Sequence, residues 1–169
     1  LEKTLILPAT ADTSGVLRTT YAFADMENLR SVELGTYEHE ETDGTITRSG
    51  WNFEGDAVDV GYTFARSFTN TSYANAADTS DAPTVMLRDM LGGAAINAKY
   101  MFEGATGLRN VILEDVACGP SADMRYMFSG ATGISNMQMR RVATGDNSYM
   151  SNMFEGVAAE DATLFPASN

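Results

Sequence analysis

The amino-acid sequence predicts an α/β repeat: a solenoid of about seven coils of ~26 residues, with a parallel β-sheet on one face and short helices, 3-10 turns and loops on the other. Three observations lead to this prediction. The phrase YMFEGATGLRNVIL, at 100–113, returns as YMFSGATGISNMQM at 126–139. Apolar residues spaced two apart recur at nearly the same interval along the whole chain. Aromatic segments lie at a nearly constant distance from most of these apolar pairs.

The apolar pairs have the period of two that marks a short β-strand. From one pair to the next the interval stays close to one repeat unit along the chain. The predicted strands lie near residues 5–7, 32–34, 58–60, 85–87, 111–113, 137–139 and 162–164. An interval kept from end to end predicts a single solenoid domain over residues 1–169, which we expect to be a fragment of a longer protein.

The opposite face is predicted from an aromatic segment that follows most strands by about 15 residues. The clearest examples are Tyr21-Ala22-Phe23, Tyr100-Met101-Phe102, Tyr126-Met127-Phe128 and Asn152-Met153-Phe154. Gly104, Gly130 and Gly156 each follow the phenylalanine by two residues. A short helix or 3-10 turn is expected to end there in a left-handed conformation, which glycine adopts at little cost. Leu29, Leu108 and Ile134 are predicted as further core residues.

The middle of the chain departs from this spacing. Phe53-Glu54-Gly55 copies the Phe-Glu-Gly of residues 102–104, but it comes late after Leu34 and only shortly before Val58. We therefore expect the strand register to be kept while the convex side is rearranged. In the following coil Phe64 and Phe68 come early, which predicts a looser outer segment.

The phrases MFEGATGLRNVIL, MFSGATGISNMQM and SNMFEG resemble the leucine-rich repeats of BspA-like bacterial surface proteins. The resemblance is close over 95–157, fair over 18–35, and elsewhere limited to the period and the strand residues. The family typically has Cys or Ala after the glycine; here Ala105, Ala131 and Val157 stand there. The resemblance implies a leucine-rich-repeat solenoid on a cell surface that attaches to host or matrix molecules or to other cells, and it brings no catalytic motif. Similar repeats occur in protist and viral proteins, so the source stays open.

Charge and hydropathy exclude two classes of partner. Twenty-three acidic residues against 11 basic ones give a net charge of -12, which repels phosphate backbones and argues against nucleic-acid binding. No apolar run approaches the roughly 18 residues of a membrane-spanning helix, so no membrane insertion is expected in this segment.

A search for reactive groups predicts no enzyme. His39 is the single histidine, lies in an acidic stretch expected to be an exposed loop, and has no partner constellation around it. Cys118 is the single cysteine and is expected at the end of a strand. The acidic clusters Glu38–Asp43 and Asp78–Asp81 could hold calcium, but neither has the spacing of a dedicated calcium loop. Solvated turns are the favoured interpretation, and no cofactor is predicted.

The remaining candidate site is the outer face of the sheet. In each strand the two apolar residues are expected in the core, and the residue between them points away from it. The residues predicted to be buried are Val32, Val85, Leu87, Val111, Leu113, Met139 and Leu164. The outward-pointing residues and the ones just after each pair supply the candidate partner-binding set: Glu33, Asp59, Met86, Arg88, Ile112, Glu114, Gln138 and Arg140. Met86 beside Ile112 is expected to form an apolar centre flanked by arginines, with an acidic end. A solvated face with incidental apolar residues is the open alternative.

Two function classes follow from these observations. The first is an extracellular or cell-surface binding or adhesion module that recognises a protein or glycan partner. The second is a structural component of a larger assembly, such as a surface layer, filament, virion or tail fibre. The last predicted strand, 162–164, lies close to the terminus, so we expect further repeats, a neighbouring domain or self-association at that end.

Overall fold

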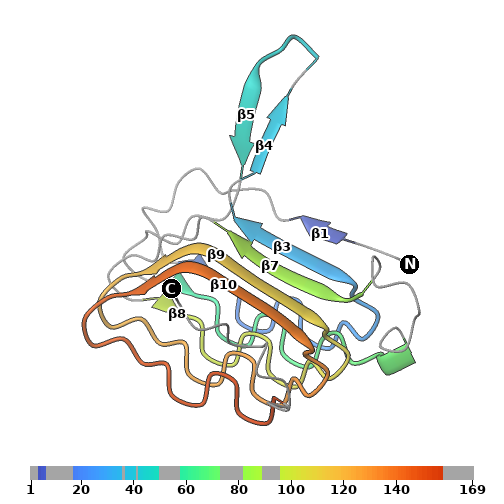
Figure 1. Cartoon of the computed structure of the whole chain (residues 1–169), viewed down its shortest axis with the longest axis vertical. Helices are drawn as coiled ribbons and strands as arrows, with labels where there is room; N and C mark the ends of the chain where they lie inside the picture. The colour runs from blue at the N-terminus through green and yellow to red at the C-terminus, as the bar shows by residue number, and fades with distance from the viewer. Residues whose placement is uncertain are drawn as a thin grey trace.

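The computed structural model describes residues 4–6, 17–35, 37–40, 42–49, 58–72, 82–88 and 96–157. Its largest element is a five-stranded parallel β-sheet with the strand order β1-β3-β7-β9-β10 (Figure 1). The strands are β1 (Thr4–Ile6), β3 (Ser31–Gly35), β7 (Thr84–Arg88), β9 (Asn110–Cys118) and β10 (Asn136–Thr144). The parallel sheet predicted on one face is therefore present.

Two smaller sheets complete the described strands. The first is parallel and contains β2 (Leu17–Arg18), β6 (Val58–Asp59) and β8 (Ile96–Asn97). The second is an antiparallel hairpin of β4 (Tyr37–Glu40) and β5 (Ile46–Ser49), which projects away from the large sheet in Figure 1. Among the described residues the helical positions are those of a 3-10 turn at 71–72. The short helices expected on the convex side are therefore tight turns in the part of the chain that is described.

The register of the large sheet corrects one predicted strand. Leu5 pairs with Val32, and Val111 pairs with Met137, in each case one repeat further along the chain. Val32, however, pairs with Val85, which lies two repeats further on. The segment at 58–60 was predicted to lie between them and does not. Its strand, β6, belongs to the three-stranded sheet.

Two insertions explain this error. The segment from Leu34 to Phe64 is about twice as long as the equivalent segment from Leu87 to Phe102. The segment from Phe64 to Val85 is likewise more than twice as long as its equivalent between Phe102 and the next strand. The extra lengths before and after the aromatic segment add up to one full period, so the apolar spacing in the sequence looked uninterrupted. The β4–β5 hairpin lies in the first insertion.

Alternation of side chains along the strands builds the core. In β7, Val85 and Leu87 are fully buried, whereas Thr84, Met86 and Arg88 are partly exposed. Val32, Leu34, Val111 and Leu113 repeat this pattern in the neighbouring strands. Leu29, Leu108 and Ile134 are buried as well, as expected. The core therefore lies between the large sheet and the layer of turns beneath it in Figure 1.

Met139 was predicted to be buried and is not. Its side chain is 37% exposed, while the paired Leu113 of the previous strand is 1% exposed. The reason is position, because within the described residues β10 is an outermost strand of the large sheet and pairs with β9 alone. Leu164, predicted to be buried in the next coil, lies outside the described residues.

A stack of phenylalanines forms the inner side of the turn layer. Ring centroids are 5.2 to 5.5 Å apart and the ring planes are nearly parallel. The stack runs in the order Phe23, Phe64, Phe102, Phe128 and Phe154. Phe64, not Phe53, is thus the member from the middle repeat; Phe53-Glu54-Gly55 lies outside the described residues.

Backbone hydrogen bonds join each turn to the next. The Phe64 N–H donates to the Met101 carbonyl at 2.9 Å, and the Phe102 N–H donates to the Met127 carbonyl at 2.8 Å. The same bond recurs between Phe128 and Met153 at 2.8 Å. Buried amide groups of the turns are therefore satisfied by the carbonyls of the neighbouring turn.

The two glycines of the repeated Gly-Ala-Thr-Gly phrase serve different purposes. Gly104 and Gly130 both have φ of 70°, the left-handed conformation that was expected after the phenylalanine. Gly133 is required for space, since a Cβ atom there would lie 2.3 Å from the Thr106 carbonyl oxygen. Gly107 is in the same situation, 2.5 Å from the Phe68 carbonyl oxygen. Close stacking of neighbouring turns therefore selects the second glycine.

Candidate functional site

The outer face of the large sheet holds a row of paired residues whose two central members, Met86 and Ile112, are apolar. Glu33 pairs with Met86, Met86 with Ile112, and Ile112 with Gln138. Met86 and Ile112 are partly exposed, and Gln138 is exposed. The structure thus brings together the predicted centre of the face, with Glu33 directly beside Met86.

Asp59 does not belong to this face. It lies in β6 of the three-stranded sheet, where its Oδ1 accepts hydrogen bonds from the Asn97 side chain at 3.0 Å and from the Gly61 N–H at 3.2 Å. The predicted acidic end of the row is therefore reduced to Glu33. The sequence placed Asp59 wrongly because the two insertions together equal one period.

A second row on the face consists of ion pairs. The Arg88 guanidinium lies 3.7 Å from Glu33 and 3.4 Å from Glu114, and Arg140 also pairs with Glu114. Arg141 lies 3.5 Å from the same Glu114 carboxylate. The arginines that were expected to flank the apolar centre are thus already paired with carboxylates of the neighbouring strands. Each such pair contributes little to stability because it is open to solvent.

Strands β9 and β10 each contain one residue with a positive φ angle, directly after Glu114 and Arg140. Asp115 and Arg141 have φ of 53° and 51°, the left-handed region that interrupts a regular strand, and their side chains form an ion pair. The Arg141 hydrogen bond holds the pKa of Asp115 below its usual value. Matched left-handed residues let both strands bend at the same level, so their pairing resumes at Val116 and Val142.

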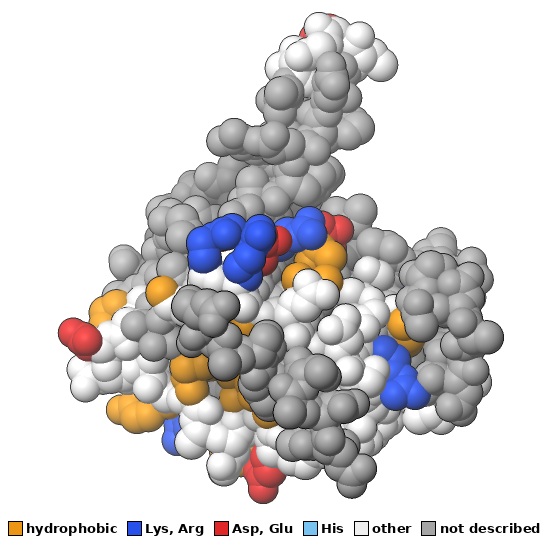
Figure 2. Space-filling view, viewed as in Figure 1, with side chains coloured by type: hydrophobic (Ala, Val, Ile, Leu, Met, Phe, Trp, Pro, Cys, Tyr) orange, Lys and Arg blue, Asp and Glu red, His pale blue; other side chains and the backbone are white. Residues whose placement is uncertain are grey.

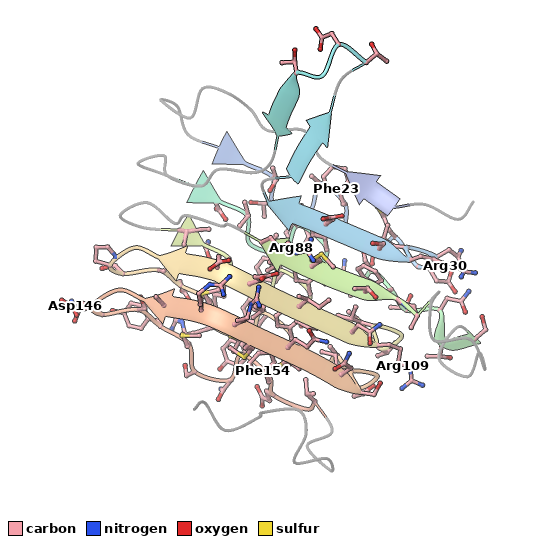
Figure 3. The ribbon with its side chains drawn as sticks, turned by 45° about the horizontal axis from the view of Figure 1, so that its top comes forward. Phe23, Arg30, Arg88, Arg109, Asp146 and Phe154 are labelled. Carbon is pink, nitrogen blue, oxygen red and sulfur yellow. The ribbon has the colours of Figure 1, made fainter. Side chains whose placement is uncertain are left out.

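Charge on this face is balanced although the whole chain is strongly acidic. Three arginines, Arg88, Arg140 and Arg141, stand among three carboxylates, Glu33, Glu114 and Asp115. Figure 2 shows blue side chains gathered in a row with red among them, next to an orange apolar patch. In Figure 3, Arg88 lies over the sheet, whereas Arg30 and Arg109 lie where β3 and β9 begin. This face is therefore close to neutral, although the chain as a whole has a net charge of -12.

The β4–β5 hairpin is an element that the sequence reasoning missed, since this acidic stretch was expected to be a loop. Its tip, residues 42–45, is exposed, and the Thr45 N–H donates to Asp43 Oδ1 at 2.9 Å. Hydrogen bonds from Thr45 hold the pKa of Asp43 below its usual value. His39 lies in β4 rather than in a loop. Asp43-Gly44 followed by the alternating Thr45-Ile46-Thr47 was the available signal, because Asp-Gly between β-type segments marks a hairpin.

A row of stacked tyrosines on the turn side was also missed. Its rings are 4.7 to 4.9 Å apart with interplanar angles of 4° to 21°. The members are Tyr21, Tyr62, Tyr100 and Tyr126. Asn152 takes the fifth position, and its side-chain amide donates to the Tyr126 hydroxyl at 3.0 Å. The signal in the sequence was a tyrosine two residues before four of the five stacked phenylalanines.

Every tyrosine of this row has a strained backbone. Their φ angles lie between 55° and 59°, which costs a residue with a side chain about 1–2 kcal/mol. A stacked aromatic pair contributes about 0.5–1.5 kcal/mol, and the row has three such pairs for four strained residues, so stacking offsets part of the strain. Burial and the neighbouring tyrosines raise the pKa of Tyr62, and burial and Tyr126 raise that of Tyr100.

Two negative observations concern the described part of the chain only. It contains no group of three or more His, Cys, Asp or Glu side chains arranged to hold a metal ion. The acidic cluster Asp78–Asp81 lies outside it. None of its segments forms a helix with the length and apolar character needed to cross a membrane.

No family model, curated protein or solved structure matches this chain. The resemblance to BspA-like repeats therefore stays a prediction from the residues themselves.

Proposed function

We propose that this chain is a non-enzymatic binding or adhesion module, located outside the cell or at its surface, that recognises a protein or glycan partner. The observation that carries the proposal is the pairing of Met86 with Ile112 on the open face of the large sheet. Adjacent, partly exposed apolar residues within a polar, charge-balanced border have the core-and-rim organisation of an interface.

The scaffold we propose for this module is a leucine-rich-repeat solenoid. Strand partners that lie one repeat apart in the sequence support it, as do the continuous phenylalanine stack and the hydrogen bonds between successive turns. In such a fold each repeat contacts only its neighbours, and the sheet provides an extended surface for partners. Five strands of the large sheet are described and 58–60 belongs to another sheet, so the proposal keeps six of the seven predicted coils, with 162–164 as the sixth, outside the described residues.

We expect the apolar residues and the ion pairs of the face to affect binding differently. Met86 and Ile112 lose water when covered, so truncating either one is expected to weaken binding by about 1–4 kcal/mol. Arg140 is exposed and paired at its edge of the face, so its removal mainly changes the salt dependence of association.

The experiment compares apolar residues on opposite sides of the molecule. Purified protein is tested on arrays of matrix proteins and surface glycans, and the affinity for any ligand found is measured for Met86→Ala, Ile112→Ala and Met26→Ala. Met26 is 37% exposed on the turn side and serves as the matched control. We expect weaker binding for both sheet variants and unchanged binding for the control. Loss in the control alone would remove the site from the sheet.

A structural role in a larger assembly, such as a surface layer, filament or virion, is the second candidate. It is favoured by the exposed Met139 on β10, an outermost strand of the large sheet. Unpaired strand edges readily join another chain. In that case the protein is its own partner, and its sedimenting mass rises with concentration but falls in Met139→Ser.

A further inference from the structure

We propose that the stacked tyrosines of the turn layer are a site of oxidative cross-linking, in which a haem peroxidase with hydrogen peroxide joins neighbouring phenols through a carbon–carbon bond. The four members are Tyr21, Tyr62, Tyr100 and Tyr126. This site lies on the turns, apart from the sheet face, and does not depend on the binding function.

The geometry holds the reacting groups together before any oxidant arrives. Tyr21 and Tyr62 have ring centroids 4.9 Å apart, and Tyr62 and Tyr100 have centroids 4.7 Å apart. Each ring comes from a different repeat, so no two of them are near neighbours in the chain. The backbone on both sides of the row is fixed by hydrogen bonds between turns, such as the Phe64 N–H to the Met101 carbonyl. The phenols are therefore kept at high effective concentration relative to one another.

The choice of residue at these positions points to the phenol group. All four tyrosines have a left-handed backbone that Gly or Asn adopts more easily, and Asn152 does stand at the fifth position. Strained residues of this kind are grounds for inferring a function when stacking alone does not outweigh the strain. The parallel phenylalanine stack, which lies inside, shows that this architecture can stack rings without hydroxyl groups.

The reaction balances with hydrogen peroxide as the oxidant. Each of two tyrosines gives one electron to the peroxidase and releases its phenolic proton to solvent, which leaves two tyrosyl radicals. The peroxide takes up two electrons and two protons and becomes two molecules of water. The radicals couple at carbons ortho to oxygen, and the hydrogens on those carbons move to the oxygens. The product is one dityrosine with two hydroxyl groups, lighter by two hydrogen atoms than the reactants.

Exposure decides which pair reacts first. Tyr21 is 52% exposed and is the end ring of the described stack, while the other three rings are less exposed. Within the described residues Tyr21 has a stacked ring on one face only, so it turns its edge toward Tyr62 more easily than Tyr62 or Tyr100, which have a ring on both faces, can turn. We therefore expect the bond between Tyr21 and Tyr62 to be the main product.

The test is peroxidase and hydrogen peroxide applied to the folded protein at several protein concentrations, followed by trypsin and mass spectrometry. Lysines and arginines of the chain place the four stacked tyrosines and Tyr149 in five separate tryptic peptides, so each cross-link is assigned directly. We expect dityrosine fluorescence from the monomer, with a yield independent of concentration and the main link between the peptides 19–30 and 49–66.

Two variants make the result decisive. Tyr62→Phe with Tyr126→Phe keeps aromatic rings in the row but leaves no two adjacent phenols, so the monomer cross-link should disappear. Tyr149→Phe is the control, because Tyr149 is equally exposed and lies against Arg125 instead of another tyrosine. Its yield should equal that of the unmodified sequence. Cross-links that persist in the double variant, or that form only between molecules, would overturn the proposal.

Discussion

At the scale of single residues, the fold depends on a few backbone positions that are repeated from turn to turn. Left-handed conformations occur in matched sets, with Asp25 and Arg66 standing where later repeats have glycine. These two residues join in an ion pair through two contacts of 2.7 and 2.8 Å. The strain of a non-glycine residue is therefore accompanied by a cross-repeat contact that glycine cannot make.

Gly133 provides the test of close stacking between turns. Gly133→Ala would place a methyl group against the Thr106 carbonyl oxygen, a rigid backbone atom, so the turns must move apart. We expect a loss of stability of roughly 1–3 kcal/mol or more, typical of forced overpacking. Urea denaturation of this variant beside Thr132→Ala, at the exposed neighbouring position, measures the effect. Equal midpoints for the two variants would show that the turns tolerate the methyl group.

At the scale of elements, the sequence predicted what is periodic and missed what is inserted. Alternating apolar residues located β3, β7, β9 and β10, because burying one face of a strand requires that pattern. The same pattern misplaced Val58–Asp59, because the two insertions of the middle repeat together restored the apparent period. The outward direction of Met86 and Ile112 was predictable from alternation alone. The tyrosine row is marked in the sequence by the repeated spacing of tyrosine and phenylalanine, but its left-handed backbone was not predictable, since tyrosine rarely adopts that conformation.

Two equivalent strand residues test how the sheet is covered. Leu113 and Met139 pair in register, yet Leu113 is 1% exposed and Met139 is 37% exposed. Leu113→Ala should therefore cost about 2–5 kcal/mol, as for a buried large residue, while Met139→Ala should cost clearly less. Chemical denaturation of both variants measures the difference. Equal losses would mean that Met139 is covered in solution, by another copy or by residues outside the described ranges.

At the scale of the whole molecule, the described ion pairs connect separate repeats within a chain of net charge -12, except for Asp123–Arg125, which lies within one repeat. The side-chain hydrogen bond from Arg66 lowers the pKa of Asp25, and that from Arg125 lowers the pKa of Asp123. A carboxyl group with a lowered folded pKa stabilises the native state above its unfolded pKa. That contribution is lost as the pH falls through the folded value.

Acid unfolding should therefore begin as the pH drops below about 4, where free aspartates start to take up protons. Protonation of Asp115 would also remove the carboxylate charge that pairs with the Arg141 guanidinium. Stability measured by urea titration between pH 7 and pH 2 should fall through this range. The fall in stability should be smaller in Asp123→Asn. This variant should already be less stable at pH 7, because it lacks the charged contact of 2.6 Å between Asp123 and Arg125. Asp146→Asn, at an exposed position, is the control and should follow the unmodified protein. A stability of the unmodified protein that stays constant down to pH 2 would contradict the assignment, because the carboxylates would then gain nothing from their arginine partners in the folded state.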